Sequence, residues 1–202
     1  RGNLADLVSS LTTFTLEAKG AYGFRHDPVN DTFAVIGGAT SPVHEKIKGV
    51  VLNNDTKAVE YELDPTNFNY KSDGTTPSNL DGTDGQVMIA LPKCWTGVFH
   101  SNGYNYYLVA DEYIPGLKIH PAFFVGVSGD SPAEWRYIGK YQAVWNDNGT
   151  LKDHDGATGA NTTDDSIMSV SGFTPITAQT RATFRTLAGN VGTGSKFWQC
   201  DM

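Results

Sequence analysis

Short apolar runs alternate with clusters of turn-forming residues over much of the chain, which is the pattern of β-strands joined by tight turns. Residues 95–113 predict a hairpin because Asn102-Gly103, among the strongest short turn signals, divides two apolar runs. Further strands are predicted at residues 21–27, 32–38, 49–54, 58–63 and 86–92. The pattern therefore indicates a β-rich chain of antiparallel strands.

A second hairpin is predicted on either side of the polar turn at residues 53–57. Three apolar residues on each side can share one buried face: Val50, Val51 and Leu52 before the turn, and Val59, Tyr61 and Leu63 after it. Along residues 86–92, Val87, Ile89 and Leu91 alternate onto one face, which predicts a strand that buries this face and ends at Pro92.

The densest apolar and aromatic stretch is residues 113–141. One run covers residues 119–127 and another covers residues 135–141, with Gly, Asp, Ser and Pro between them. Neither run has the sustained i, i+3, i+4 spacing of a helix, so two short strands across a loop are predicted.

Two segments do have helical spacing. Residues 4–16 follow a possible N-cap, Asn3, and carry their apolar residues on one side, at Leu4, Leu7, Val8, Leu11 and Phe14. This predicts a short amphipathic helix that can dock on its own domain or on a neighbouring subunit. Late in the chain, residues 171–194 predict an interior helix with Phe184, Leu187, Ala188 and Val191 on one face and its exit at residues 189–194.

Two long polar stretches, residues 66–85 and 146–166, lack any periodicity. Loops of this length inside a compact domain are commonly functional or contact a partner. The second contains one large apolar residue, Leu151, and is expected to be an exposed insertion.

Composition excludes some partners. The formal net charge is −7 and the 15 basic residues are scattered, whereas nucleic-acid affinity depends on clustered Lys and Arg. No apolar run reaches the roughly 18 residues of a membrane-spanning helix. Cys94 and Cys200 lie far apart without a second Cys near either, which predicts two free thiols. No cofactor is expected, and the first residue, Arg1, suggests a processed or partial chain.

The segments DEYIPGLKIHPAFF and WRYIGKYQA, with AYGFRHD and DGTDGQVMIALPK before them, resemble tailed-phage and prophage structural proteins that carry a C-type-lectin-like domain. The resemblance runs from about Ala21 to Met202. It implies an α+β fold with a C-type-lectin-like domain at residues 21–202 and an attachment segment at residues 1–20. In the resembling proteins further strands follow the segment matched by Trp198 and Asp201, so we expect this domain to be incomplete at its C-terminus.

The sequence contains candidate catalytic residues, but they lack the partners that catalysis requires. Cys94 with His100 or His120 lacks an activating partner nearby, and Asp111, Glu112 and Glu134 have no spacing that demands glycoside hydrolysis. We therefore assign no catalytic residue.

Residues 146–155 contain the polar side chains that a cation site would use. However, a calcium loop with Gly156 at its sixth position would place Leu151 at its first, so a solvated polar loop is favoured. The alternative, which follows from the resemblance, is a less regular calcium loop, and no metal ligand is assigned.

The resemblance favours a non-enzymatic component of a phage virion, such as a head fibre, decoration or tail-fibre protein. Expected partners are other virion proteins, further copies of the chain, and a host-surface glycan or protein. Aromatic and polar side chains in or near the loops are the candidate binding residues: Tyr104, Trp145, Asn148, His154, Asn161 and Trp198. The alternatives are a virion-associated carbohydrate-active enzyme and a cellular sugar-binding module.

Overall fold

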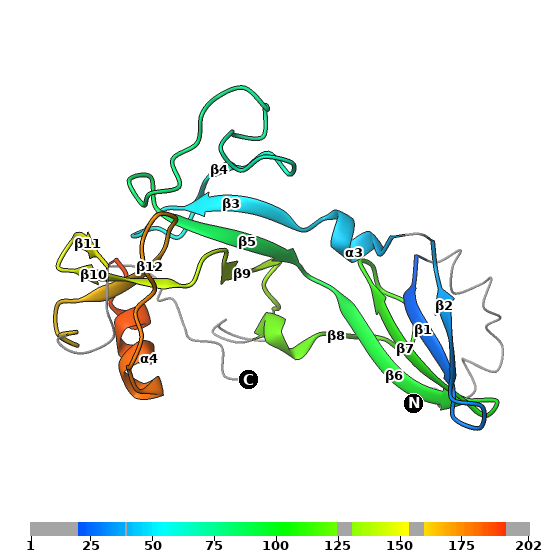
Figure 1. Ribbon diagram of the computed structural model, residues 1–202. Coiled ribbons are helices and arrows are strands. Elements are labelled where there is room, and N and C mark those ends of the chain that lie inside the picture. The colour runs from blue at the N-terminus through cyan, green and yellow to red at the C-terminus, as the bar shows by residue number, and fades with distance from the viewer. Residues whose placement is uncertain (1–19, 39, 125–130, 154–159, 193–202) are drawn as a thin grey trace. The chain divides into compact units, whose positions relative to one another are not determined.

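The computed structural model of the chain describes residues 20–38, 40–124, 131–153 and 160–192. Within this part the chain forms three mostly antiparallel sheets and one late helix of nine residues (Figure 1). The β-rich α+β prediction is thereby confirmed. The predicted helix at residues 4–16 lies outside the described residues.

The described chain divides into two compact units. Unit 1 contains the described residues up to Ile47 together with Leu91–Arg136, and unit 2 contains Lys48–Ala90 together with the described residues from Tyr137 onward. The chain passes between the units three times, so each unit is built from two separate stretches of sequence.

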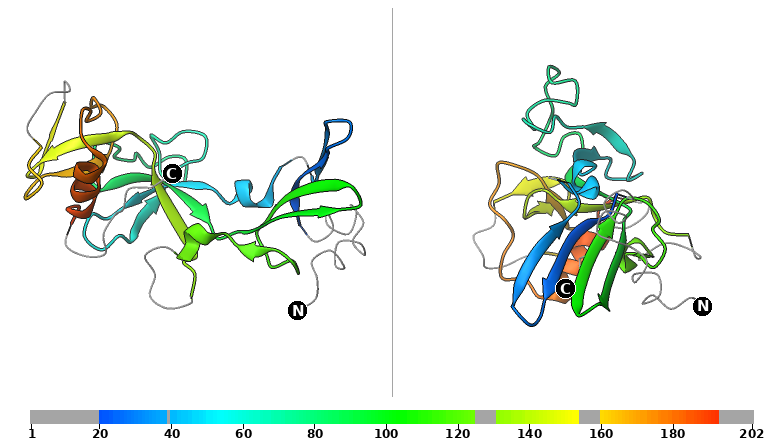
Figure 2. Two further views of the ribbon diagram at one scale, coloured as in Figure 1. Left: turned by 90° about the horizontal axis from the view of Figure 1, so that it is seen from below. Right: turned by 90° about the vertical axis from the view of Figure 1, so that its right-hand side faces the viewer.

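Unit 1 is organised on one five-stranded sheet with the strand order β2-β1-β7-β6-β8. All neighbouring strands are antiparallel, and Figure 2 shows the β1 and β2 strands beside the β6–β7 hairpin. The strands are β1 (Tyr22–Asp27), β2 (Thr32–Ile36), β6 (Trp95–Ser101), β7 (Tyr104–Ala110) and β8 (Lys118–Ile119). A short helix, α3 (Pro42–Glu45), follows β2.

The predicted Asn-Gly turn closes the β6–β7 hairpin. Asn102 and Gly103 have φ angles of 50° and 82°, the left-handed values that a two-residue turn of this type requires. Ser101 and Tyr104 then pair across the turn.

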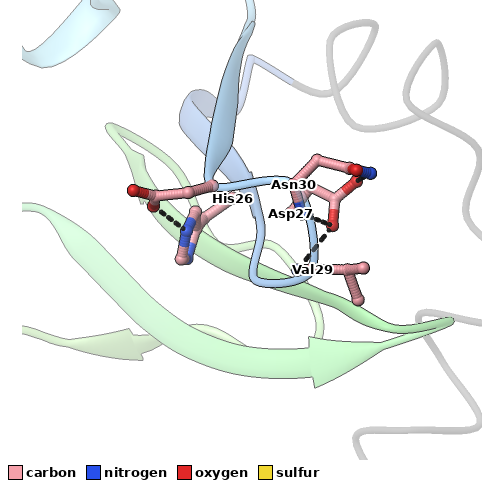
Figure 3. A network of polar contacts seen from close by, with 5 residues as sticks. His26, Asp27, Val29 and Asn30 are labelled. Carbon is pink, nitrogen blue, oxygen red and sulfur yellow. Dashed lines mark hydrogen bonds and ion pairs between the residues drawn. The ribbon is translucent and has the colours of Figure 1, made fainter.

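A side-chain cap shapes the β1–β2 turn. The carboxylate of Asp27 accepts hydrogen bonds from the backbone N–H groups of Val29 and Asn30, at 2.9 and 3.2 Å, and from the Asn30 amide (Figure 3). These bonds lower the pKa of Asp27, with the Asn30 side chain the largest cause. His26 and Asp31 face each other across the same turn at 3.0 Å.

One face of the unit 1 sheet carries its core. This core is built from the residue before β1, one residue of β2, three residues of β7 and two residues from the segment that follows β7. The buried set comprises Ala21, Ile36, Tyr106, Leu108, Ala110, Ile114 and Leu117.

Unit 2 holds two sheets and helix α4. The larger sheet has the order β4-β3-β5-β9 and the smaller the order β11-β10-β12. Their strands are β3 (Lys48–Leu52), β4 (Val59–Glu62), β5 (Gln86–Pro92), β9 (Trp135–Gly139), β10 (Ala143–Asp147), β11 (Thr150–Lys152) and β12 (Ser166–Ser169). The ends of β5 and β9 cross the division between the units.

The late helix α4 (Arg181–Gly189) lies within the segment where the sequence predicts an interior helix. The Thr180 hydroxyl oxygen caps it by accepting from the Thr183 N–H at 3.1 Å, and Leu187 and Ala188 are buried. The helix predicted from the periodicity of this segment is therefore confirmed.

The prediction of a strand over residues 119–127 is wrong for its described part. Only Lys118–Ile119 form a short strand, and Pro121–Phe124 form a 3₁₀ helix, η1. Pro121 has no N–H to donate to a strand ladder, and the Nδ1 atom of His120 accepts from the Ala122 N–H at 3.2 Å instead. Residues 125–127 lie outside the described residues.

Two further predictions need correction. Strand β5 does not bury only the face of Val87, Ile89 and Leu91: Gln86, Met88 and Ala90 on the other face are buried, whereas Ile89 and Leu91 are half-buried. The stretch at residues 146–166 is not wholly an exposed loop, because β10 and β11 form a hairpin at Asn148-Gly149, with φ angles of 45° and 92°.

We expect Gly85→Ala to lower the free energy of unfolding by about 2–4 kcal/mol, because strain at positive φ and overpacking each cost about 1–3 kcal/mol. Gly85 has a φ of +132°, and an added Cβ would lie 2.1 Å from the Leu52 carbonyl oxygen. Gly149→Ala is the matched control, because its φ is +92° but no described atom lies within 4 Å. That variant should lose about 1 kcal/mol. Urea unfolding measures both, and equal losses would contradict the prediction.

Candidate functional site

Two of the predicted binding residues meet in unit 2 at a buried carboxylate. The Nε1–H group of Trp145, in β10, donates to Oδ2 of Asp165 at 3.0 Å. The backbone N–H of Asn161 donates to the same oxygen at 2.5 Å. Asp165 is only 2% exposed, so these bonds replace water around its charge.

The C-terminal end of α4 ties down the same segment. Asn190, the C-cap residue, donates through its side-chain amide to the carbonyl oxygens of Thr162 and Asp165, at 3.0 and 2.8 Å. Helix α4 also contacts β12. Residues 160–166 are therefore held against both the helix and the small sheet, and Trp145 has a fixed orientation.

The remaining predicted binding residues do not join this cluster. Asn148 forms the β10–β11 turn at positive φ, so its role there is conformational. Tyr104 belongs to unit 1, where the Arg25 guanidinium lies 4.4 Å from its ring centre. His154 and Trp198 lie outside the described residues.

The polar stretch at residues 64–85 is ordered by short-range capping. Asp64, Asp73 and Asp81 each accept hydrogen bonds from backbone N–H groups two or three residues later in the chain. Hydrogen bonds lower the pKa of all three carboxyls: a threonine hydroxyl is the largest cause for Asp64 and Asp73, followed by the backbone N–H groups, and a backbone N–H is the largest cause for Asp81. The loop therefore presents a shaped polar surface.

Tyr61 anchors this loop to β4. Its hydroxyl donates to Oδ2 of Asp84 at 2.8 Å and accepts from the Asn79 N–H at 3.1 Å. Burial, with a smaller contribution from Asp84, raises the pKa of Tyr61 to about 12.

Cys94 and His120 are brought together through their backbones, since the His120 N–H donates to the Cys94 carbonyl oxygen at 2.9 Å, whereas the other candidate catalytic residues with assigned contacts lie elsewhere. Burial raises the pKa of the Cys94 thiol, which disfavours the reactive thiolate. Asp111 pairs with Lys46 at 2.6 Å, and Glu134 pairs with Lys93. His100 contacts Asn105 at 3.0 Å. Within the described ranges, no group of three or more His, Cys, Asp or Glu side chains is arranged to hold a metal ion.

Sequence reasoning missed an apolar surface on unit 1. The sheet face opposite the core exposes five large side chains, here called the apolar face: Phe24, Phe33, Val35, Val98 and Tyr107. A signal was present, because neighbouring residues such as Tyr106 and Tyr107 are both aromatic. A strand with neighbouring aromatic residues is apolar on both faces, whereas a half-buried strand alternates apolar and polar residues.

Strand β2 adds a second unusual feature, because it ends the sheet order in unit 1. Edge strands are commonly protected by charged residues, by Pro or by bulges. Thr32–Ile36 contains no charged residue and no Pro, and its pairing with β1 runs without a register shift.

Comparison of the chain with protein-family models, curated proteins and solved structures finds no match. In the portion that the structure describes, no helix is both long and apolar enough to cross a bilayer.

We expect Asp165→Ala to lower the free energy of unfolding by about 2–4 kcal/mol, since it leaves the Trp145 and Asn161 N–H groups without their charged acceptor. Asp164→Ala is the control, because this neighbouring carboxylate accepts from Asn161 in an exposed position. It should change stability by no more than about 0.5 kcal/mol. Urea unfolding separates the two, and similar losses would exclude a special role for Asp165.

The lowered pKa of Asp73 has the side chain of Thr76 as its largest cause. Thr76→Val should therefore raise this pKa toward its ordinary value, while Thr66→Val, which alters the cap of Asp64, should leave it unchanged. Because the folded pKa is depressed, the stabilisation is present above the ordinary pKa and is lost as pH falls through the folded value. Carbon-13 NMR titration of the carboxyl group reports each pKa, and an unchanged Asp73 midpoint in Thr76→Val would refute the assignment.

Proposed function

We propose that the protein is a non-enzymatic structural component of a phage virion and that copies of it associate through strand β2. The observation that carries the proposal is the edge strand of the unit 1 sheet, Thr32–Ile36, which has no charged residue, no Pro and, among the described residues, no strand on its outer side. An edge strand offers a row of backbone donors and acceptors to any strand that can align with it.

The β1–β2 turn makes this edge a rigid template. Asp27 caps the turn, and every residue of β2 is in register with a residue of β1. Little conformational entropy is then lost when a second strand aligns, which favours association. Antiparallel pairing of two β2 strands would extend both sheets across a two-fold axis, the commonest symmetry of homo-oligomers.

The virion location rests on the resemblance to tailed-phage structural proteins, as does the C-type-lectin-like fold. The resembling proteins carry a late helix at the position that matches α4, which supports this part of the proposal. In this proposal the capped loop at residues 64–85 and the segment around Asp165 in unit 2 contact a host-surface glycan or protein. Their fixed backbones suit that role because ordered loops lose little entropy on binding.

We expect Ala34→Glu to weaken self-association by roughly tenfold or more, because like charges brought together at an interface cost several kcal/mol. Ala34 lies opposite Arg25 in β1, so the new carboxylate has a partner of opposite charge within the monomer. Sedimentation velocity over a wide range of concentrations measures the association constant.

Val29→Glu is the matched control, because it adds the same charge to the same hairpin at a turn residue that is 86% exposed and outside β2. It should leave association unchanged. A wild-type chain that stays monomeric at every concentration would refute pairing through β2. Mass spectrometry of purified particles tests the location separately, and absence of the chain from them would refute the virion assignment.

A further inference from the structure

The apolar face forms a continuous row across four strands of unit 1. In the register of the sheet, Val35 of β2 lies opposite Phe24 of β1, Phe24 lies opposite Tyr107 of β7, and Tyr107 lies opposite Val98 of β6. Residues that are directly opposite in antiparallel strands project from the same face. The four side chains therefore line up at right angles to the strands.

Ring contacts extend this row to Phe33. The rings of Phe24 and Tyr107 stack with centroids 4.6 Å apart, and Phe33 meets the edge of Phe24 at 5.6 Å. Despite these contacts the face is accessible: Val98 is 70% exposed, Val35 is 65% exposed and Phe33 is 64% exposed. A contiguous apolar surface of this kind usually has an occupant.

The face is also hollowed. A cavity of about 730 Å³ opens on it and includes Tyr22, Phe24, Val98, Tyr107 and Val109 in its lining. Tyr22 is the first residue of β1, so the hollow begins where the described chain enters the sheet.

We infer that residues 4–16 form an amphipathic helix that packs its apolar side into this hollow on the same chain. The segment has the required pattern, since Leu4, Leu7, Val8, Leu11 and Phe14 recur at helical spacing. Its sole charged residue, Asp6, falls on the opposite side of the helix from these five.

The length of the predicted helix matches the width of the apolar row. A helix of this length measures about 20 Å at 1.5 Å per residue. The four strands that carry the apolar row span about 14 Å, because neighbouring strands lie roughly 4.8 Å apart. Such a helix can cover the row from β2 to β6.

The short connection between residues 4–16 and β1 favours packing on the same chain over packing on a second copy. Residues 17–20 join the segment to Ala21 and can reach about 13 Å when extended. The row at Phe24 lies only about 7 Å along β1 from Tyr22, which is two residues away. A tether this short gives the segment an effective concentration of the order of millimolar at its own face.

Hydrogen–deuterium exchange of the full chain, followed by mass spectrometry, tests the inference. We expect the amides of residues 4–16 to exchange roughly tenfold or more slowly than in the unstructured chain. Leu7→Glu with Leu11→Glu should remove this protection, and so should Val98→Glu on the sheet. Ser9→Glu with Thr13→Glu is the matched control, because it adds the same charges to the polar side of the helix.

Three results would overturn the packing of residues 4–16 on the apolar face of the same chain. Unprotected amides in the wild-type chain, or protection that survives Val98→Glu in a chain with an unchanged circular dichroism spectrum, would overturn the inference. Protection that rises with protein concentration would assign the segment to a neighbouring copy and overturn packing on the same chain. Ala34→Glu separates this test from the proposed function, since it should weaken association through β2 and leave the protection of residues 4–16 intact.

Discussion

The register of strand β7 is the constraint on which unit 1 depends. This strand pairs with β6 on one edge and β1 on the other, so β2 and β8 take their places relative to it. In most half-buried strands a slip by one residue is prevented because it would expose the core face. Here the slip would exchange Tyr106 and Leu108 for Tyr107 and Val109, which are also apolar. Burial alone therefore specifies the register weakly, and the Asn102-Gly103 turn must fix it.

Unit 2 achieves order in a different way. Its long polar stretch contains few apolar residues, but Phe68 and Leu80 pack against the cluster of Val51, Leu63 and Val87. Between these two anchors, carboxylate and amide caps satisfy the backbone locally. A loop built in this way keeps its polar side chains at the surface without losing its shape, which is what a recognition surface requires.

Local signals in the sequence predicted local structure well. The Asn102-Gly103 hairpin and helix α4 were predictable because a turn and a helical face are each specified within a few neighbouring residues. The same dipeptide at Asn148-Gly149 was overlooked because its surroundings are polar, although Leu151 from β11 packs with the buried residue Val144.

Features that depend on distant pairing could not be predicted in this way. Trp145 and Asn161 meet at Asp165 only because β10 pairs with β12, and no spacing in the sequence encodes that contact. The division into two units has the same origin, since each unit joins stretches that are far apart along the chain. The apolar face was hidden for another reason: in β2 and β7 the other face is also apolar, so composition could not separate core from surface.

Strand β2 presents two surfaces that make different demands. Its outer edge offers backbone donors and acceptors, which only another extended chain can satisfy in sequence. Its outward side chains, Phe33 and Val35, offer apolar area, which a helix covers well because its own backbone groups are already paired. The two directions are perpendicular, since ladder hydrogen bonds lie in the plane of a sheet and side chains project from it. Pairing with a second copy and packing of residues 4–16 can therefore occur on β2 together, without competition between them.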